Sequence, residues 1–177
     1  MNRSLNPKGR RSRSEVLKSY GRHLIYSEGS KTEPLYNENI KRVIEENYKF
    51  HNTKIEIEIT PHQGLNTLGL VDFAESDVKK RLRSKEKIDY VWIFFDKDSF
   101  PNDQFENAHN KIIKKNKNNL FNDDGDAVDN EYIRWFSIWS NECFELWVLL
   151  HFMYFDSKLS REDYIPKINN YLKPKKI

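Results

Sequence analysis

The chain has 177 residues, of which 37% are hydrophobic and 14% are aromatic. This apolar content is enough to form the core of one ordinary domain, and it excludes a fully disordered or fibrous protein. The 30 basic side chains oppose 27 acidic ones, so the net charge of +3 is too small to indicate nucleic-acid binding by itself.

The charge is unevenly distributed along the chain. Residues 1–22 carry a net charge of +6, which leaves −3 on the remaining residues. Residues 1–19 contain almost nothing apolar, so we expect a flexible basic arm ahead of a single domain over residues 20–177. For the arm, the sequence leaves two interpretations open: a solvated tail, or a segment that contacts phosphates without sequence preference.

Cysteine content and hydropathy indicate a cytoplasmic protein without a membrane anchor. The single cysteine, Cys143, cannot form an internal disulfide, and no apolar stretch of signal-peptide length follows the basic N-terminus. The most apolar segment, residues 143–155, is shorter than the roughly 20 residues that a membrane-spanning helix needs. It also contains Glu145 and His151, so we expect a buried helix.

Four segments have the composition of β-strands. His23–Tyr26 is a short apolar run, and in Ile55–Ile59 isoleucine alternates with glutamate. Tyr90–Phe95 is a continuous run of β-forming residues, typical of a central strand that is covered on both faces. Tyr132–Trp139 is the fourth candidate strand.

A predicted helix follows each of these strands. The helical segments are identified by apolar residues at helical spacing or by a continuous apolar run: 36–44, 71–82, 105–113 and 143–155. We expect Thr32 or Glu33 to cap the first helix, and Ser140 or Asn141 to cap the last. No further helix is expected before the C-terminal lysines, so the last residues would form a docked tail, or a C-terminal piece is missing.

The alternation of strands and helices predicts the fold class. It indicates an α/β fold with an open, mainly parallel sheet, right-handed crossovers and helices on both faces. The four tryptophans lie in strand or core-helix patterns, so we interpret them as packing residues: Trp92, Trp135, Trp139 and Trp147.

Carboxylates follow three of the four predicted strands, where open parallel sheets bind their ligands. Glu28 follows the first strand, Asp96 and Asp98 the third, and Glu145 the fourth. Asp96 ends a buried run, where an ionised carboxylate needs a charged partner or a metal. With Lys31 beside a helix N-terminus, which favours a phosphate, the pattern predicts a Mg²⁺ site, with Mn²⁺ as the alternative, for phosphodiester chemistry.

Three segments of the sequence resemble motifs of one known family. Residues 26–34 read YSEGSKTEP, residues 95–98 read FDKD, and residues 139–147 read WSNECFELW with His151 and Phe152 after them. They resemble the EGxKTEP opening, the FDxD strand end and the SNPCFELWLLLHF block of the RloB-like family. Members of this family are encoded beside restriction-modification and phage-defence genes, and their chains usually continue further than this one.

The resemblance implies a Toprim-like fold, in which a glutamate and an Asp-x-Asp pair form a Mg²⁺ site. By position, Glu28 is that glutamate, and Asp96 and Asp98 are the pair. Two departures stand out. Glu142 replaces the usual proline, and residues 99–100 replace the usual acidic and histidine residues, which weakens the case for a further ligand after Asp98.

Glu28, Asp96 and Asp98 each have a structural alternative to a role in the site. In the site, Glu28 would act as a general base or acid, or as a second metal ligand. In the structural alternative, its carboxylate only interacts with the dipole of the following helix. Asp96 and Asp98 are either metal ligands or strand-end caps.

The other candidates are equally open. Lys31 is a phosphate contact or a solvated loop residue, and Thr32 is a helix cap or a substrate ligand. Glu145 is a member of the site, as a ligand of a second metal, or half of a buried ion pair with a lysine or an arginine. Asn141 orients Glu145 or caps the helix.

These observations predict a Mg²⁺-dependent endonuclease acting on DNA or RNA, with anti-phage defence implied by the resemblance. The alternative is a non-catalytic nucleic-acid-binding or adaptor module that uses the basic arm and residues 79–83 and works with a partner ATPase. A third reading is a toxin-like effector that this ATPase holds silent. The sequence leaves open whether the chain forms a homodimer.

Overall fold

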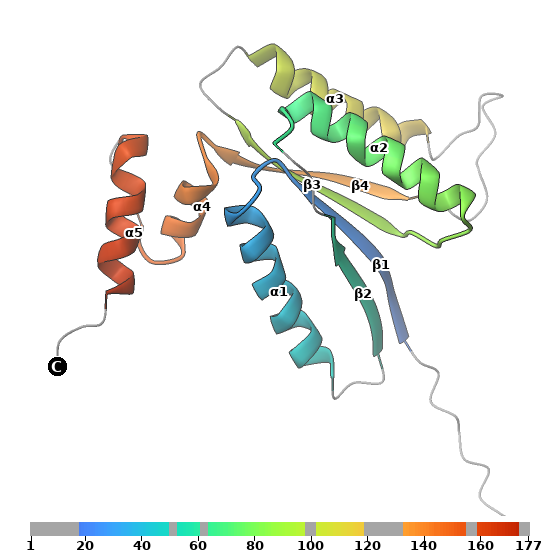
Figure 1. Ribbon diagram of the computed structural model, residues 1–177, viewed down its shortest axis with the longest axis horizontal. Coiled ribbons are helices and arrows are strands. Elements are labelled where there is room, and N and C mark those ends of the chain that lie inside the picture. The colour runs from blue at the N-terminus through green and yellow to red at the C-terminus, as the bar shows by residue number, and fades with distance from the viewer. Residues whose placement is uncertain are drawn as a thin grey trace, which may run out of the picture.

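The computed structural model describes residues 18–49, 53–60, 64–97, 102–118, 133–154 and 159–173. In this part of the chain, four parallel strands form one sheet in the order β2-β1-β3-β4 (Figure 1). The strands are β1 (Lys18–Ser27), β2 (Thr53–Ile59), β3 (Tyr90–Lys97) and β4 (Arg134–Asn141). The predicted open, parallel α/β fold and its four strands are confirmed.

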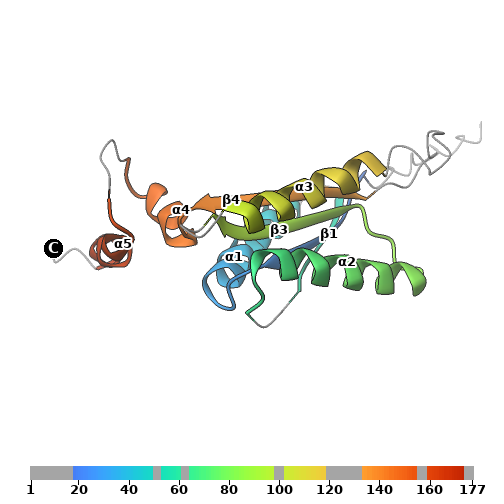
Figure 2. The same cartoon turned by 90° about the horizontal axis from the view of Figure 1, so that it is seen from above.

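Helices cover both faces of the sheet, as predicted. The helices are α1 (Thr32–Tyr48), α2 (Thr67–Arg83), α3 (Asn102–Asn118), α4 (Phe144–Leu150) and α5 (Tyr164–Leu172), with a 3₁₀ turn η1 (Arg161–Asp163) before α5. Figures 1 and 2 show α2 and α3 side by side on one face, whereas α1 lies on the other. None of the helices in the described residues is long and apolar enough to cross a membrane.

The main core lies between the sheet and helices α2 and α3. Val91, Ile93 and Phe95 of β3 alternate with half-buried residues and pack in one cluster with Leu70 and Ala108 of these helices. β3 is therefore fully buried on one face only. On the other face α1 packs mainly on β2, so this part of the face carries half-buried rings such as Trp92.

Two tryptophans are less buried than the sequence predicts. Trp139, on the edge strand β4, and Trp147, on the short helix α4, are each 46% exposed, although both line a small hollow with Phe144. The ammonium group of Lys97 lies 5.6 Å from the centroid of the Trp139 ring. Trp135, by contrast, is buried in the core, as predicted.

The C-terminal third differs from the prediction in two respects. Helix α4 ends at Leu150 and does not reach residue 155. Helix α5 is present where no further helix was predicted, because Tyr164 packs with Cys143 and Leu149 in a second apolar cluster. The available sequence signal was a set of apolar residues at helical spacing that spans only nine residues: Tyr164, Ile168, Tyr171 and Leu172.

The start of β1 also corrects the predicted arm. Strand β1 begins at Lys18, so residues 18 and 19 belong to the sheet, and its register with β2 shifts between Ser19 and Arg22. The rest of the predicted arm, residues 1–17, lies outside the described residues.

Candidate active site

The topology of the sheet creates a switch point between β1 and β3. From β1 the chain continues to β2 on one side, and from β3 it continues to β4 on the other. Ligands of open parallel sheets bind beyond the carboxyl ends of the strands at such a point. Glu28 directly follows β1, and Asp96 is the penultimate residue of β3, so both predicted residues lie there.

Glu28 is held beside Asp96 by hydrogen bonds at both ends of the residue. Its backbone N–H donates to the carbonyl oxygen of Phe94 at 2.9 Å. Its carboxylate accepts hydrogen bonds from the backbone N–H of Asp96 at 3.2 Å and from the hydroxyl of Thr67 at 3.2 and 3.3 Å. Because Thr67 is the buried first residue of α2, three elements fix the position of the Glu28 carboxylate.

The carboxylate of Asp96 is positioned from the neighbouring strand. Asp96 pairs with Ser140 of β4 in the sheet, and the Ser140 hydroxyl donates a hydrogen bond to Oδ1 of Asp96. The Asp96 side chain nevertheless reaches a hollow of about 250 Å³ at the carboxyl edge of the sheet.

Three carboxylates line this hollow, which we call the acidic hollow. Glu33 comes from α1, Asp96 from β3 and Glu145 from α4. Burial raises the pKa of Glu33, and the nearby charges of Asp96 and Glu145 raise it further, although the hydrogen bond from the backbone N–H of Gly29 opposes this effect. The hollow thus concentrates negative charge where the sequence predicts a cation.

Glu33 is the member of the acidic hollow that the sequence analysis missed, since we interpreted it only as a helix cap. It is 6% exposed, and its Oε1 accepts the Gly29 N–H at 3.1 Å. A Cβ atom at position 29 would lie 1.9 Å from Oε2 of Glu33, so only glycine allows this approach. The available sequence signal was a glycine four residues before a glutamate in the first helical turn.

Of the residues predicted to bind the substrate, two line the acidic hollow and one does not. Lys31 and Thr32 are exposed and line the acidic hollow. Asn141 is exposed at the end of β4 and is not among the residues that line it. Asp98 lies outside the described residues, so its predicted role stays a prediction.

The predicted helix caps are wrong. The N-cap of α1 is Lys31 and that of α4 is Cys143, and neither makes a side-chain capping hydrogen bond. One reason is Glu142, which adopts φ 63° between β4 and α4 and thereby displaces the helix start beyond residues 140 and 141. Proline cannot adopt this φ, so the departure from the family motif at this position has a backbone consequence.

A divalent metal fits the chemistry of these side chains. Glu28, Asp96 and Glu145 offer the hard oxygen ligands that Mg²⁺ prefers, and a cation would relieve the repulsion around Glu33. The described residues, which do not include Asp98, contain no group of three acidic, histidine or cysteine side chains already placed to hold a metal. The carboxylates are therefore of the chemical type that binds Mg²⁺, but the described residues alone do not form a complete metal site.

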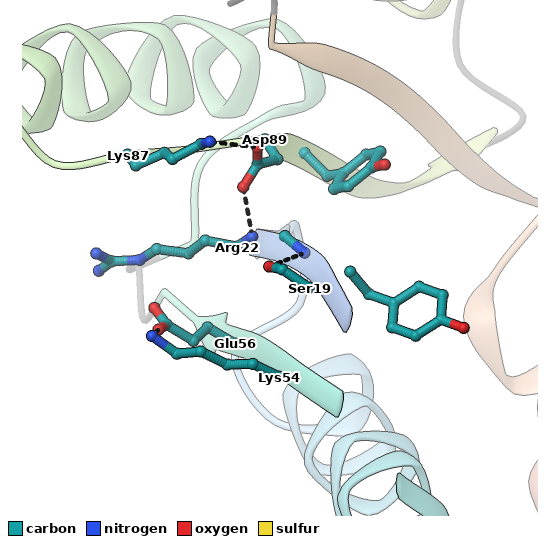
Figure 3. Close-up of a pocket in the computed structure, with 9 residues that line it drawn as sticks. Ser19, Arg22, Lys54, Glu56, Lys87 and Asp89 are labelled. Atoms are coloured by element: carbon teal, nitrogen blue, oxygen red, sulfur yellow. Dashed lines mark hydrogen bonds and ion pairs between the residues drawn. The ribbon is translucent and has the colours of Figure 1, made fainter. Parts of the chain in front are cut away.

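A larger hollow, of about 440 Å³, lies at the opposite edge of the sheet. The residues labelled in Figure 3 line it, and they come from β1, from the start of β2 and from the segment that leads to β3. Its lysines are matched by carboxylates, with Lys54 Nζ 2.6 Å from Glu56 and Lys87 Nζ 3.9 Å from Asp89. Because ligands of parallel sheets bind at the carboxyl edge, we place the candidate active site at the smaller hollow.

Comparison with known proteins supports the resemblance seen in the sequence. The model of a family described as RloB-like protein matches residues 23–177. No curated protein and no solved structure matches the chain.

Proposed function

Since the chain belongs to the RloB-like family, we propose that it is a Mg²⁺-dependent nuclease that hydrolyses phosphodiester bonds in DNA or RNA. One observation carries the proposal: at the switch point of the sheet, the carboxylate of Glu28 accepts a hydrogen bond from the backbone N–H of Asp96. A role in anti-phage defence is the part of the proposal that rests on the family resemblance, whereas the cytoplasmic location rests on the cysteine content and hydropathy of the sequence.

Each of these side chains would have its own role in the hydrolysis. Asp96, together with Asp98, would hold Mg²⁺, with Glu145 as the candidate ligand of a second ion. The metal, when bound, stabilises negative charge that develops on the phosphate oxygens. The Glu28 carboxylate would take the proton of the attacking water, and its hydrogen bonds from Thr67 and Asp96 would keep it in place. Lys31 would contact a phosphate from the rim of the acidic hollow.

Cleavage of single- and double-stranded DNA and RNA, with and without Mg²⁺ or Mn²⁺, tests this proposal. We expect metal-dependent cleavage that falls at least ~100-fold in Glu28→Ala and Asp96→Asn, the size of loss usual when a group that stabilises the transition state is removed. Asp103→Asn, on the exposed side of α3, is the matched control and should retain activity. Full activity in Asp96→Asn would contradict the assignment.

The second candidate is a non-catalytic nucleic-acid-binding module. It is favoured by the lack, within the described residues, of three side chains already placed to hold a metal. Binding that weakens steeply with salt, without cleavage in either metal, would favour this module. The assay would then be repeated with the ATPase encoded nearby, because an adaptor or a silenced effector would depend on such a partner.

A further inference from the structure

One basic residue at the acidic hollow, Arg161, lies outside the three sequence motifs. Arg161, the first residue of η1, lines the hollow together with Glu33, Asp96 and Glu145. Glu33 is buried, and Asp96 and Glu145 are half-buried, whereas Arg161 is exposed. The hollow therefore has carboxylates at its base and a guanidinium group at its rim.

Contacts within the C-terminal part of the chain hold Arg161 near the strand ends. Three residues after Arg161, the hydroxyl of Tyr164 donates a hydrogen bond to Oε2 of Glu142 at 2.8 Å. The backbone N–H of Glu142 in turn donates to the carbonyl oxygen of Lys97, next to Asp96, at 3.1 Å. Apolar packing of Tyr164 with Cys143 adds to these contacts, and Figure 1 shows α5 beside α4 at this end of the sheet.

The arrangement of charge limits what the acidic hollow can bind. A phosphate diester is an anion, so carboxylates alone would repel it. Lys31, from the loop before α1, and Arg161, from η1, add positive charge at the rim from two separate parts of the chain. Arginine suits this role because its planar guanidinium can donate two parallel hydrogen bonds to one phosphate.

We infer that Arg161 binds a phosphate group of the substrate, so that the C-terminal segment completes the site formed by the sheet. The inference rests on the proposed function for the identity of the substrate as a nucleic acid. It goes further by placing a phosphate contact outside the three motifs.

The test measures binding of a short single-stranded oligonucleotide by fluorescence anisotropy over a series of salt concentrations. The parent is Asp96→Asn, which prevents cleavage during the measurement. Adding Arg161→Ala should weaken binding ~10-fold, because a charged hydrogen bond is lost. It should also reduce the slope of log K against log salt by ~0.7, the value for one phosphate contact on a single strand.

Two further variants separate a phosphate contact from a structural effect. Arg161→Lys keeps the charge, so the salt slope should stay close to that of the parent. Arg42→Ala, on the exposed surface of α1, removes an arginine that does not line the acidic hollow and should leave the slope unchanged.

An unchanged affinity and slope in Arg161→Ala would overturn the inference, as would an equal loss in Arg42→Ala or a parent that does not bind nucleic acid. The proposed function fails separately, if the wild-type chain binds but never cleaves in the presence of Mg²⁺ or Mn²⁺. The binding readout does not depend on cleavage, so the two failures are distinguishable.

Discussion

The two edges of the sheet arrange their charged side chains in opposite ways. At the amino edge, basic and acidic groups form ion pairs: Arg22 with Glu86 at 2.9 Å, Lys54 with Glu56 at 2.6 Å, and Lys87 with Asp89 at 3.9 Å. At the carboxyl edge, the carboxylates of Glu28 and Asp96 accept hydrogen bonds from hydroxyl and N–H groups, and three carboxylates surround one hollow.

We interpret the paired charges of the amino edge as support for the fold, and the gathered carboxylates of the other edge as part of the proposed active site. Matched pairs lower the electrostatic cost of the amino edge, although exposed pairs contribute little each. Burial and the charges of Asp96 and Glu145 raise the pKa of Glu33, and clusters of carboxylates with shifted pKa values are typical of functional sites. Substitutions at the amino edge should therefore change stability, and substitutions at the carboxyl edge should change activity.

The largest expected effect tests the carboxyl edge through a residue that would not touch the substrate. Thr67→Val removes the hydroxyl that donates to Glu28 and keeps the shape of the side chain. We expect metal-dependent cleavage to fall ~10–100-fold, the usual effect of losing a hydrogen bond that orients a residue of a metal site. Cleavage rates and thermal unfolding are measured together, and Thr53→Val, at the start of β2, is the control. Unchanged cleavage would show that Glu28 needs no such support.

The next effect tests the amino edge. Gly21 has φ 88°, and a Cβ atom there would lie 2.8 Å from the Cβ of Asp89. Gly21→Ala should therefore lower the free energy of unfolding by ~1–2 kcal/mol, measured by urea denaturation, and should leave the cleavage rate of the folded protein unchanged.

Gly64→Ala is the control that distinguishes the effect of a positive φ from the effect of the steric clash at position 21. Gly64 also has a positive φ, 42°, but a Cβ atom there would meet nothing within 4 Å. A smaller loss of stability is expected at this position. A loss of cleavage in folded Gly21→Ala would contradict the separation of the two edges.

The smallest effect is a pH dependence of stability from the ion pairs of Glu58 with Arg22, which lines the amino edge, and with Arg81. Hydrogen bonds from Arg81 lower the pKa of Glu58, and Arg22 lowers it further, although burial opposes them. A lowered pKa means that this carboxylate contributes stability above its ordinary pKa of 4.5, and that the contribution is lost as the pH falls through the lowered value.

Glu58→Gln should consequently cost ~0.5–1 kcal/mol at neutral pH, a value that allows for screening of partly exposed pairs. The difference from the wild type should shrink as the pH falls below the ordinary glutamate pKa, with unfolding measured at each pH. Glu46→Gln, on the exposed surface of α1, is the control. A cost that persists in acid would indicate a packing effect in place of the ion pairs.

Much of the fold was predictable because its signals are local. The apolar run at Tyr90–Phe95 and the alternation at Ile55–Ile59 predict strands, and their order with the helices predicts a parallel sheet. α5 was missed because its helical pattern is short and its stability comes from the contact of Tyr164 with Cys143, about twenty residues earlier. The cap of α4 was missed because Glu142 adopts a backbone conformation that its sequence does not signal.

For the site, the sequence by itself determined that Glu28 and Asp96 follow parallel strands, because strand-ending carboxylates are visible as a pattern. Only the tertiary structure decided that β1 and β3 are neighbours, which brings the two residues together at the switch point. It also decided that Glu33 and Arg161 reach the same hollow. No local pattern encodes these approaches, because they depend on helix packing and on contacts between residues far apart in the chain.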